Sequence, residues 1–391
     1  MRLFFITLSF LSSVGTQLHG QCKEIKQSLR VLNETLLDSS IALLDQAEVV
    51  IKENGLETVD EKCMAKYYYT RGITQLMLGK KTDSLDQKAE LLGASGENYL
   101  MFLKQPDRPS ELESNVKSNL VSLAVEYGNL GVLCYQQADY NRAFAFVEKG
   151  MELKNAFGQN EISEQDYYNA LVCSKIVGSN EKAIAYSDSL LSSKNLSNNK
   201  RIKYLCQKAE VLINMKNLDS AKTVISELRT LDSTDLSVRN VNLQFLVAKD
   251  DFQGALTELD VLSRKDNKRV ALLVLKGQIL HKLEKDSLSQ ISFVEALALD
   301  SMNSAARYGL GALSVSHANN YIKASLNSDD ALKAQNDSLA ELKFQMAIQQ
   351  FEKIPASDQK YLDALTALKA VYESLGNEAK VEEIISRIAD L

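Results

Sequence analysis

The sequence predicts an all-α, right-handed α-solenoid of antiparallel helical hairpins, and three observations lead to this prediction. The 391 residues include only 3 Pro and 17 Gly, fewer turn residues than a fold rich in β-hairpins needs. Apolar residues recur at intervals of 3, 4 and 7, the period of a helix. The same pattern also returns at a constant interval along the chain, which is typical of a repeat array. Sandwiches, barrels and propellers are therefore excluded.

The N-terminal 20 residues (1–20) form a segment of their own. Arg2 precedes a mainly apolar run over residues 3–14, and small and polar residues follow it. This order is typical of a secretory signal peptide, and the run is shorter than the roughly 20 apolar residues of a membrane-spanning helix. A lipid-attachment signal carries a small residue directly before its cysteine, whereas Gln21 precedes Cys22 here. We therefore expect an exported protein, periplasmic or extracellular, that is not a lipoprotein. Cleavage after Gly20 would leave Gln21 as its first residue, and cleavage after Gly15 is the alternative.

Residues 21–115 are predicted to be an N-terminal helical region with an irregular first repeat. Residues 65–79 have the pattern of a first hairpin helix and contain Gly72 and Gly79. Residues 93–115 hold two of the three prolines, together with Gly-Ala-Ser-Gly. Because Gly and Pro weaken helices, we expect this stretch to interrupt the partner helix as an insertion or linker.

Residues 116–303 are predicted to be the regular part of the array. The stretch 127–153 reads as two helices that meet at residues 138–140, with the small residues Gly131 and Ala143 where the helices approach. This pattern resembles a tetratricopeptide repeat, a unit of 34 residues with two antiparallel helices. The resemblance implies small residues at positions 8 and 20, where the helices pack closest, and larger residues at positions 24 and 27, which contact the next unit.

Three units follow one another without a break, at residues 202–235, 236–269 and 270–303. Their positions 20, 24 and 27 hold residues of the expected sizes, namely Ala221, Ala255 and Ser289, then Ile225, Leu259 and Phe293, then Leu228, Leu262 and Ala296. Any amphipathic hairpin shows helical spacing, but it does not keep small residues in a constant register. We therefore expect about seven or eight hairpins in one array.

Residues 304–391 are predicted to hold C-terminal repeats with a helical insertion near 318–346. Residues 305–315, which contain R-Y-G-L-G-A, begin a repeat; a long polar stretch follows, and the second helix appears only at residues 347–353. Together with F-E-K-I-P and L-K-A-V-Y-E-S-L-G-N, this layout resembles exported tetratricopeptide proteins of the Bacteroidota. The resemblance implies a scaffold and an export route, without naming a partner.

No catalytic, cofactor or metal site can be assembled from the sequence. The chain lacks G-x-x-x-x-G-K-[ST] and G-x-S-x-G, and after residue 20 only His281 and His317 remain, neither with a second histidine at metal-binding spacing. The net charge is -6, and no basic stretch interleaves with aromatic residues as in a nucleic-acid interface. We therefore expect no enzyme, cofactor, metal, nucleic-acid partner or membrane span.

The five cysteines show no pairing pattern. An odd number in an exported protein leaves at least one thiol free or joined between chains. Cys134, Cys173 and Cys206 fall within helical patterns, so we expect them to be small buried residues.

The predicted function is binding through the concave face of the array. The resemblance implies that positions 2, 5, 6, 9, 12 and 13 of each unit line this face. Mapped onto this chain, they give a peptide-binding groove of Asn129, Gln136, Tyr168, Asn169, Lys175, Lys203, Gln207, Glu210, Asn240, Gln244, Gln278, His281 and Tyr308. Asn and Gln both donate and accept hydrogen bonds, which suits an extended peptide backbone. Any exposed helix face is polar, however, so this pattern alone leaves an ordinary solvated surface as the other interpretation.

We therefore expect a non-catalytic scaffold that binds a protein or peptide of the cell envelope. Envelope glycan binding and an accessory role in an exported enzyme complex are the alternatives. The absence of Trp counts against glycans, because sugar faces stack well on indole rings.

Asp-Ser followed by Ala, Leu, Met or Thr is unusually frequent. It resembles the acceptor motif for O-glycosylation of exported Bacteroidota proteins, which would modify Ser84, Ser189, Ser220, Ser233, Ser287, Ser301 and Ser338. Asp and Ser also favour helix starts, so capping is the alternative explanation.

Overall fold

The fold is all-α, as the sequence predicts. The computed structural model describes residues 24–31, 37–54, 61–155, 162–263, 269–326 and 328–391. Every regular element in these ranges is a helix, and they contain no strand. The chain forms two compact units, with the boundary between Asn195 and Leu196. The signal-peptide prediction for residues 1–20, like Gln21 and Cys22, lies outside the described residues.

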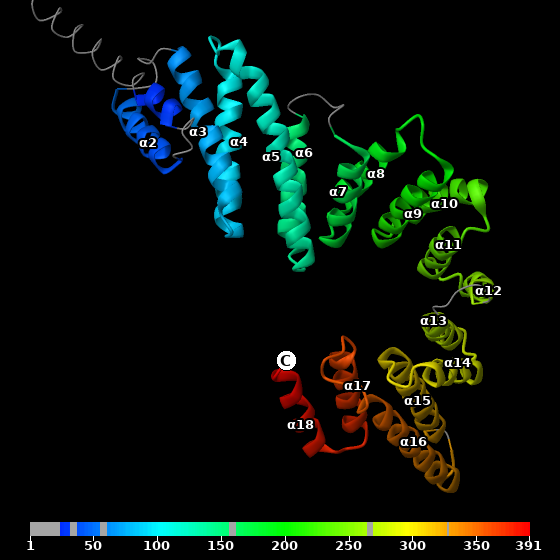
Figure 1. Ribbon diagram of the computed structural model, residues 1–391. Helices are drawn as coiled ribbons and strands as arrows, with labels where there is room; N and C mark the ends of the chain where they lie inside the picture. The colour runs from blue at the N-terminus through cyan, green and yellow to red at the C-terminus, as the bar shows by residue number, and fades with distance from the viewer. Residues whose placement is uncertain (1–23, 32–36, 55–60, 156–161, 264–268, 327) are drawn as a thin grey trace, which may run out of the picture. The chain divides into compact units, whose positions relative to one another are not determined.

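The N-terminal unit contains three complete hairpins behind a shorter start. Residues 24–31 are helical, and the following helices are α2 (Leu37–Asn54), α3 (Glu61–Lys81), α4 (Leu85–Lys104), α5 (Ser110–Gln136), α6 (Tyr140–Asn155), α7 (Glu164–Ile176) and α8 (Asn180–Leu191). Each odd-numbered helix from α3 pairs with its successor, and α3 also contacts α5. The hairpins therefore stack in chain order within this unit (Figure 1).

The C-terminal unit contains five hairpins. Its helices are α9 (Asn198–Asn214), α10 (Leu218–Asp232), α11 (Leu236–Ala248), α12 (Phe252–Leu262), α13 (Arg269–Lys282), α14 (Asp286–Leu299), α15 (Ser304–Ser325), α16 (Asp330–Phe351), α17 (Tyr361–Ser374) and α18 (Glu378–Ala389). Side chains that accept from backbone N–H groups fix many of the helix starts, as Asp235 does for α11 and Asn303 for α15. Contacts of α9 with α11, α13 with α15 and α15 with α17 stack the first helices of successive hairpins.

The turn inside a hairpin has the same geometry in six of the described hairpins. Position 15 of six units has a positive φ of 57–74°, at Ala138, Gly178, Lys216, Asp250, Glu284 and Gly376. In each turn, the N–H of the following residue donates to the carbonyl oxygen five residues earlier, at 2.8–3.0 Å. This bond closes the first helix as in a Schellman motif, and the left-handed residue lets the chain reverse at once into the second helix. Only two of the six positions hold Gly, so the other four carry backbone strain.

The predicted register of the three regular units is confirmed by burial. Ala221, Ala255 and Ser289 at position 20 are all 0% exposed. The three residues at position 24 and the three at position 27 are also buried. The reason is the one given for the pattern: small residues let the two helices of a hairpin approach, and larger residues fill the space toward the next hairpin.

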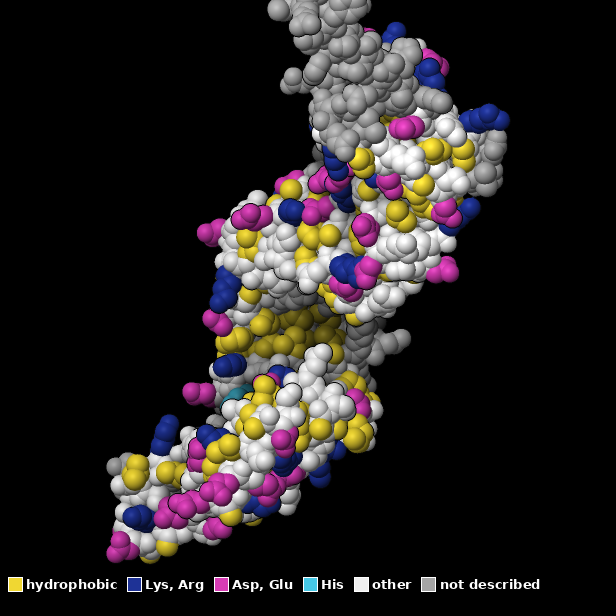
Figure 2. All heavy atoms as spheres, turned by 90° about the vertical axis from the view of Figure 1, so that its left-hand side faces the viewer, with side chains coloured by type: hydrophobic (Ala, Val, Ile, Leu, Met, Phe, Trp, Pro, Cys, Tyr) yellow, Lys and Arg dark blue, Asp and Glu magenta, His cyan; other side chains and the backbone are white. Residues whose placement is uncertain are grey.

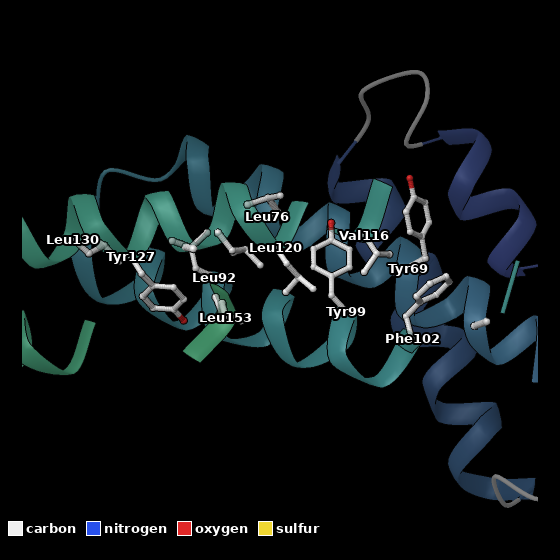
Figure 3. Close-up of a cluster of buried hydrophobic side chains, with 13 residues drawn as sticks. Tyr69, Leu76, Leu92, Tyr99, Phe102, Val116, Leu120, Tyr127, Leu130 and Leu153 are labelled. Atoms are coloured by element: carbon white, nitrogen blue, oxygen red, sulfur yellow. The ribbon is translucent and has the colours of Figure 1, made fainter. Parts of the chain in front are cut away.

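The stretch 93–115 differs from its prediction. Residues 93–104 continue α4 without interruption, and only residues 105–109 leave the helix before α5 begins. The small residues taken as helix breakers instead allow close packing, since Ser95 Oγ donates to the carbonyl oxygen of Gly72 at 2.6 Å. A Cβ atom added at Gly72 would lie 2.8 Å from the ring of Tyr99. Tyr99 belongs to the buried cluster of α3 to α6 that Figure 3 shows.

The predicted insertion near 318–346 is a lengthening of one hairpin. Its two helices, α15 and α16, have 22 residues each and pair along their length, whereas the neighbouring α14 and α17 have 14. Ala318, Ala340 and Phe344 are buried between them, together with Val371 of α17.

The cysteines divide into two groups. Cys134, Cys173 and Cys206 are free thiols and buried, as predicted. Cys63, which the sequence analysis left unassigned, is disulfide-bonded.

Candidate binding groove

A groove of about 820 Å³ lies between α9, α11 and α13, the first helices of three consecutive hairpins. Five of the predicted groove residues line it, namely Lys203, Gln207, Glu210, Asn240 and Gln244, and Asn214 lies beside them. On α9 these residues recur at intervals of 4, 3 and 4, so the helix turns them all toward one side. The regular spacing of the repeat then sets α11 beside α9 with its own amides on the same side.

The floor of this groove is apolar. Ile202, Cys206 and Leu243 are each more than nine-tenths buried, and Leu272 and Leu275 of α13 complete the floor. The sequence mapping did not include Leu272 and Leu275, because it took polar residues as candidates. The groove therefore offers hydrogen-bonding walls and an apolar base, a combination that suits an extended polypeptide with alternating side chains.

This groove carries charges of both signs, and one of its carboxylates is also part of a helix cap. Lys203 and Glu210 bring opposite charges, while Asp235 accepts from the backbone N–H groups of Ser237 at 2.7 Å and Val238 at 3.1 Å. Burial raises the pKa of the Cys206 thiol to about 12, and the carboxylate of Glu210 adds to this effect. A thiol with this pKa stays protonated at neutral pH, so the groove contains no activated nucleophile at Cys206.

A second, smaller pocket of about 280 Å³ lies between α5 and α7 and holds Tyr168 and Asn169. Its other walls are mostly apolar, with Val132, Tyr135 and Val172 among them. The Asn169 side-chain oxygen already accepts from Gln165 Nε2 at 2.7 Å. This pocket is thus less polar than the sequence mapping implied.

The other mapped residues lie outside these two pockets. Asn129 and Gln136 are exposed on α5, Lys175 is half-buried on α7, and Gln278 is exposed on α13. The centroid of the Tyr308 ring lies 5.5 Å from that of Phe351 on α16, so part of this side chain packs within the long hairpin α15–α16.

The two histidines meet at one carboxylate, although their sequence spacing gave neither a companion. His281 Nδ1 lies 2.8 Å from one oxygen of Asp286, and His317 Nε2 lies 2.9 Å from the other. Burial by itself raises the pKa of Asp286, but the hydrogen bonds from both imidazoles outweigh it and leave the pKa below its ordinary value. His281 therefore connects α13 to α14, and His317 extends this connection to α15.

Across the described ranges, no group of three or more His, Cys, Asp or Glu side chains is placed to hold a metal ion. None of the described helices is both long enough and apolar enough to cross a membrane. On the face shown in Figure 2, acidic, basic and hydrophobic side chains are interspersed.

The sequence matches no protein-family model and no curated protein. Several crystal structures are similar in fold. A tetratricopeptide repeat protein from Parabacteroides merdae is 13% identical, with 78% of this chain and 98% of that one covered and a TM-score of 0.45. The C-terminal part of a repeat protein from Cytophaga hutchinsonii is 13% identical, covering 76% and 99%, with a TM-score of 0.41. YrrB, described as a TPR protein with an unusual peptide-binding site, is 16% identical, covering 50% and 93%, with a TM-score of 0.35.

The assignment of the repeat type rests on the chain's own geometry. The 34-residue register, the left-handed residue at position 15 and the buried small residues at position 20 recur from hairpin to hairpin. The described helices therefore form hairpins of the tetratricopeptide type.

Proposed function

We propose that this protein is an exported, non-catalytic scaffold that binds a protein or peptide partner in the groove of α9, α11 and α13. The observation that carries the proposal is the convergence of amide side chains from two hairpins over an apolar floor. An extended backbone needs donors and acceptors along its length, and Asn and Gln supply both.

Export is part of the proposal. The segment 1–20 has the order of a signal peptide, and the disulfide at Cys63 is typical of an oxidising compartment. The C-terminal layout, from R-Y-G-L-G-A to the final repeat, supports an origin among the exported repeat proteins of the Bacteroidota. The periplasm or the cell exterior is then the place where the partner is found.

O-glycosylation at the Asp-Ser motifs belongs to the same proposal. Six of the seven serines are exposed, namely Ser84, Ser220, Ser233, Ser287, Ser301 and Ser338. Ser189 is half-buried and its hydroxyl donates to the Ala185 carbonyl oxygen at 3.0 Å, so we expect it to stay unmodified. Some motifs also serve the fold, since Ser84 caps α4.

The test is a pull-down from an envelope extract with the purified protein and a groove variant. The variant replaces three amides, Asn214→Ala, Asn240→Ala and Gln244→Ala. One hydrogen bond contributes about 0.5–1.5 kcal/mol net, so Asn240→Ala alone should weaken binding at most about tenfold, and the triple variant far more. Mass spectrometry of the eluate separates a protein partner from a glycan.

A matched control replaces three exposed amides outside the groove, Gln290→Ala, Asn319→Ala and Asn320→Ala. We expect this control to retain the partner that the groove variant loses. Equal retention by both variants would show that the partner uses another surface. Recovery of glycan alone would favour the glycan-binding alternative.

A further inference from the structure

A separate cavity in the N-terminal unit lies between α2, α3 and α4 and has a volume of about 610 Å³. Ile51, Met64, Tyr67 and Tyr68 give it mainly apolar walls. The sequence mapping did not include any of its residues. Glu48, Lys52, Arg71, Gln75 and Asn98 supply its polar lining, so the hydrogen bonds that each of them already makes determine what the cavity can bind.

Two amide side chains of this cavity are hydrogen-bonded to each other, and each amide has one polar atom without a protein partner. Asn98 Nδ2 donates to Gln75 Oε1 at 2.9 Å and to the carbonyl oxygen of Ala94 at 2.8 Å. Both hydrogens of Asn98 Nδ2 are therefore engaged, and these bonds fix which end of each amide is nitrogen. Among the described residues, Gln75 Nε2 has no acceptor and Asn98 Oδ1 has no donor.

Gln75 is only 8% exposed, and the Nε2 atom without a protein partner is not among the fully buried polar atoms, so it can still be reached from outside the protein. Because Gln75 lines the cavity, a molecule inside it can satisfy the donor. Asn98, whose amide is bonded to that of Gln75, contributes an acceptor, and a donor with an acceptor on one side is the complement of the N–H and C=O of one residue in an extended chain.

The charged groups of the cavity are already paired. Glu48 is bonded to Lys52 at 2.6 Å, to Arg71 at 3.0 Å and to the Tyr67 hydroxyl at 3.2 Å. The hydrogen bond from Lys52, with Arg71 nearby, holds the pKa of Glu48 below its ordinary value. Arg71 also bonds Asp45 at 2.9 Å. Because these charged side chains bond one another, the amides of Gln75 and Asn98 are the polar groups that we expect a ligand to bind.

We propose that this cavity binds one residue of an extended polypeptide through the backbone N–H and C=O of that residue and through its apolar side chain. The carbonyl oxygen of the residue accepts from Gln75 Nε2, and its N–H donates to Asn98 Oδ1. The side chain contacts the rings of Tyr67 and Tyr68. An acetamido sugar has a single trans amide, whose N–H and C=O point to opposite sides, so it cannot make both hydrogen bonds on one side. This second site does not depend on the groove of α9, α11 and α13.

The probe is N-acetyl-L-leucine methylamide, titrated into the full protein with 13C-labelled methionine methyl groups. Met64 lines the cavity, so its methyl resonance reports binding there, and Met64→Leu identifies that resonance. For a ligand of this size we expect a Kd on the order of 1 mM. Gln75→Leu keeps the apolar volume but removes the donor, and should raise the Kd about tenfold, as expected for one lost hydrogen bond.

Gln207→Leu is the matched control, because it makes the same change in the other groove. It should leave the Met64 response unchanged, while circular dichroism checks that both variants fold. A Met64 resonance that does not move up to 20 mM probe, a concentration about twenty times that Kd, would overturn the proposal. So would equal affinity of Gln75→Leu and the parent, or a response to N-acetylglucosamine but not to the peptide analogue.

Discussion

Replacing Gly277 with Ala tests how the hairpins are packed. Gly277 is position 8 of its unit and lies on α13, opposite the fully buried ring of Phe293 on α14. A Cβ atom at Gly277 would lie 2.7–2.9 Å from three atoms of that ring. Gly309 on α15 approaches the same ring still more closely, so the ring has no room to move aside.

Two opposing effects set the magnitude. Ala is a better helix former than Gly by about 1 kcal/mol. Overpacking a well-filled core costs about 1–3 kcal/mol. Gly128 on α5 isolates the first effect, because a Cβ atom there would meet nothing within 4 Å. We therefore expect Gly128→Ala to raise the free energy of unfolding by about 1 kcal/mol, and Gly277→Ala to lower it or leave it unimproved.

A double-mutant cycle with Phe293→Leu separates the steric cost from the helix preference. Urea unfolding followed by circular dichroism gives the free energies, and hydrogen exchange of α13 to α15 localises the change. We expect Gly277→Ala to be stabilising once the ring is removed, with a coupling energy of about 1–3 kcal/mol. A coupling energy near zero would refute the idea that Phe293 fixes the distance between these helices.

Three further predictions concern backbone strain, pH and thiol chemistry. Lys216→Gly should raise the free energy of unfolding by about 0.5–1 kcal/mol, because glycine adopts the left-handed conformation without strain. Gly376→Ala should lower the free energy of unfolding by about as much. Thermal melts in which the two variants do not shift the melting temperature in opposite directions would contradict this. Since the pKa of Asp286 is lowered in the fold, its contribution to stability is present above the unfolded pKa and is lost as the pH falls through the folded one. Acid unfolding of Asp286→Asn should therefore lack that part of the pH dependence, and an unchanged acid profile would count against it. A thiol reagent should modify Cys206 only in denaturant, because it is buried, and Cys63 only after reduction, because it is disulfide-bonded. Mass spectrometry measures the labelling, and a label on either cysteine in the native, oxidised protein would contradict this prediction.

The local pattern of the sequence determined the type of element and its register. The 34-residue period, with Ala221 and Ala255 at one position and Leu228 and Leu262 at another, predicts hairpins whose buried residues match the structure. This succeeds because a repeat is stabilised by its own two helices and its nearest neighbours, so the information is local. The same reasoning placed the groove amides of α9 and α11 on one side.

Contacts between residues far apart in sequence were decided only by the tertiary structure. Residues 93–104 read as a linker because Gly and Ser weaken an isolated helix, yet Ser95 donates to the carbonyl oxygen of Gly72 and Tyr99 packs against Gly72, so this stretch is held against α3 as a helix. Asp286 brings together His281 and His317, which no spacing rule relates. The open donor of Gln75 depends on a hydrogen bond from a different helix. Composition and periodicity report what a residue prefers by itself, whereas packing partners and unpaired groups exist only once the helices are assembled.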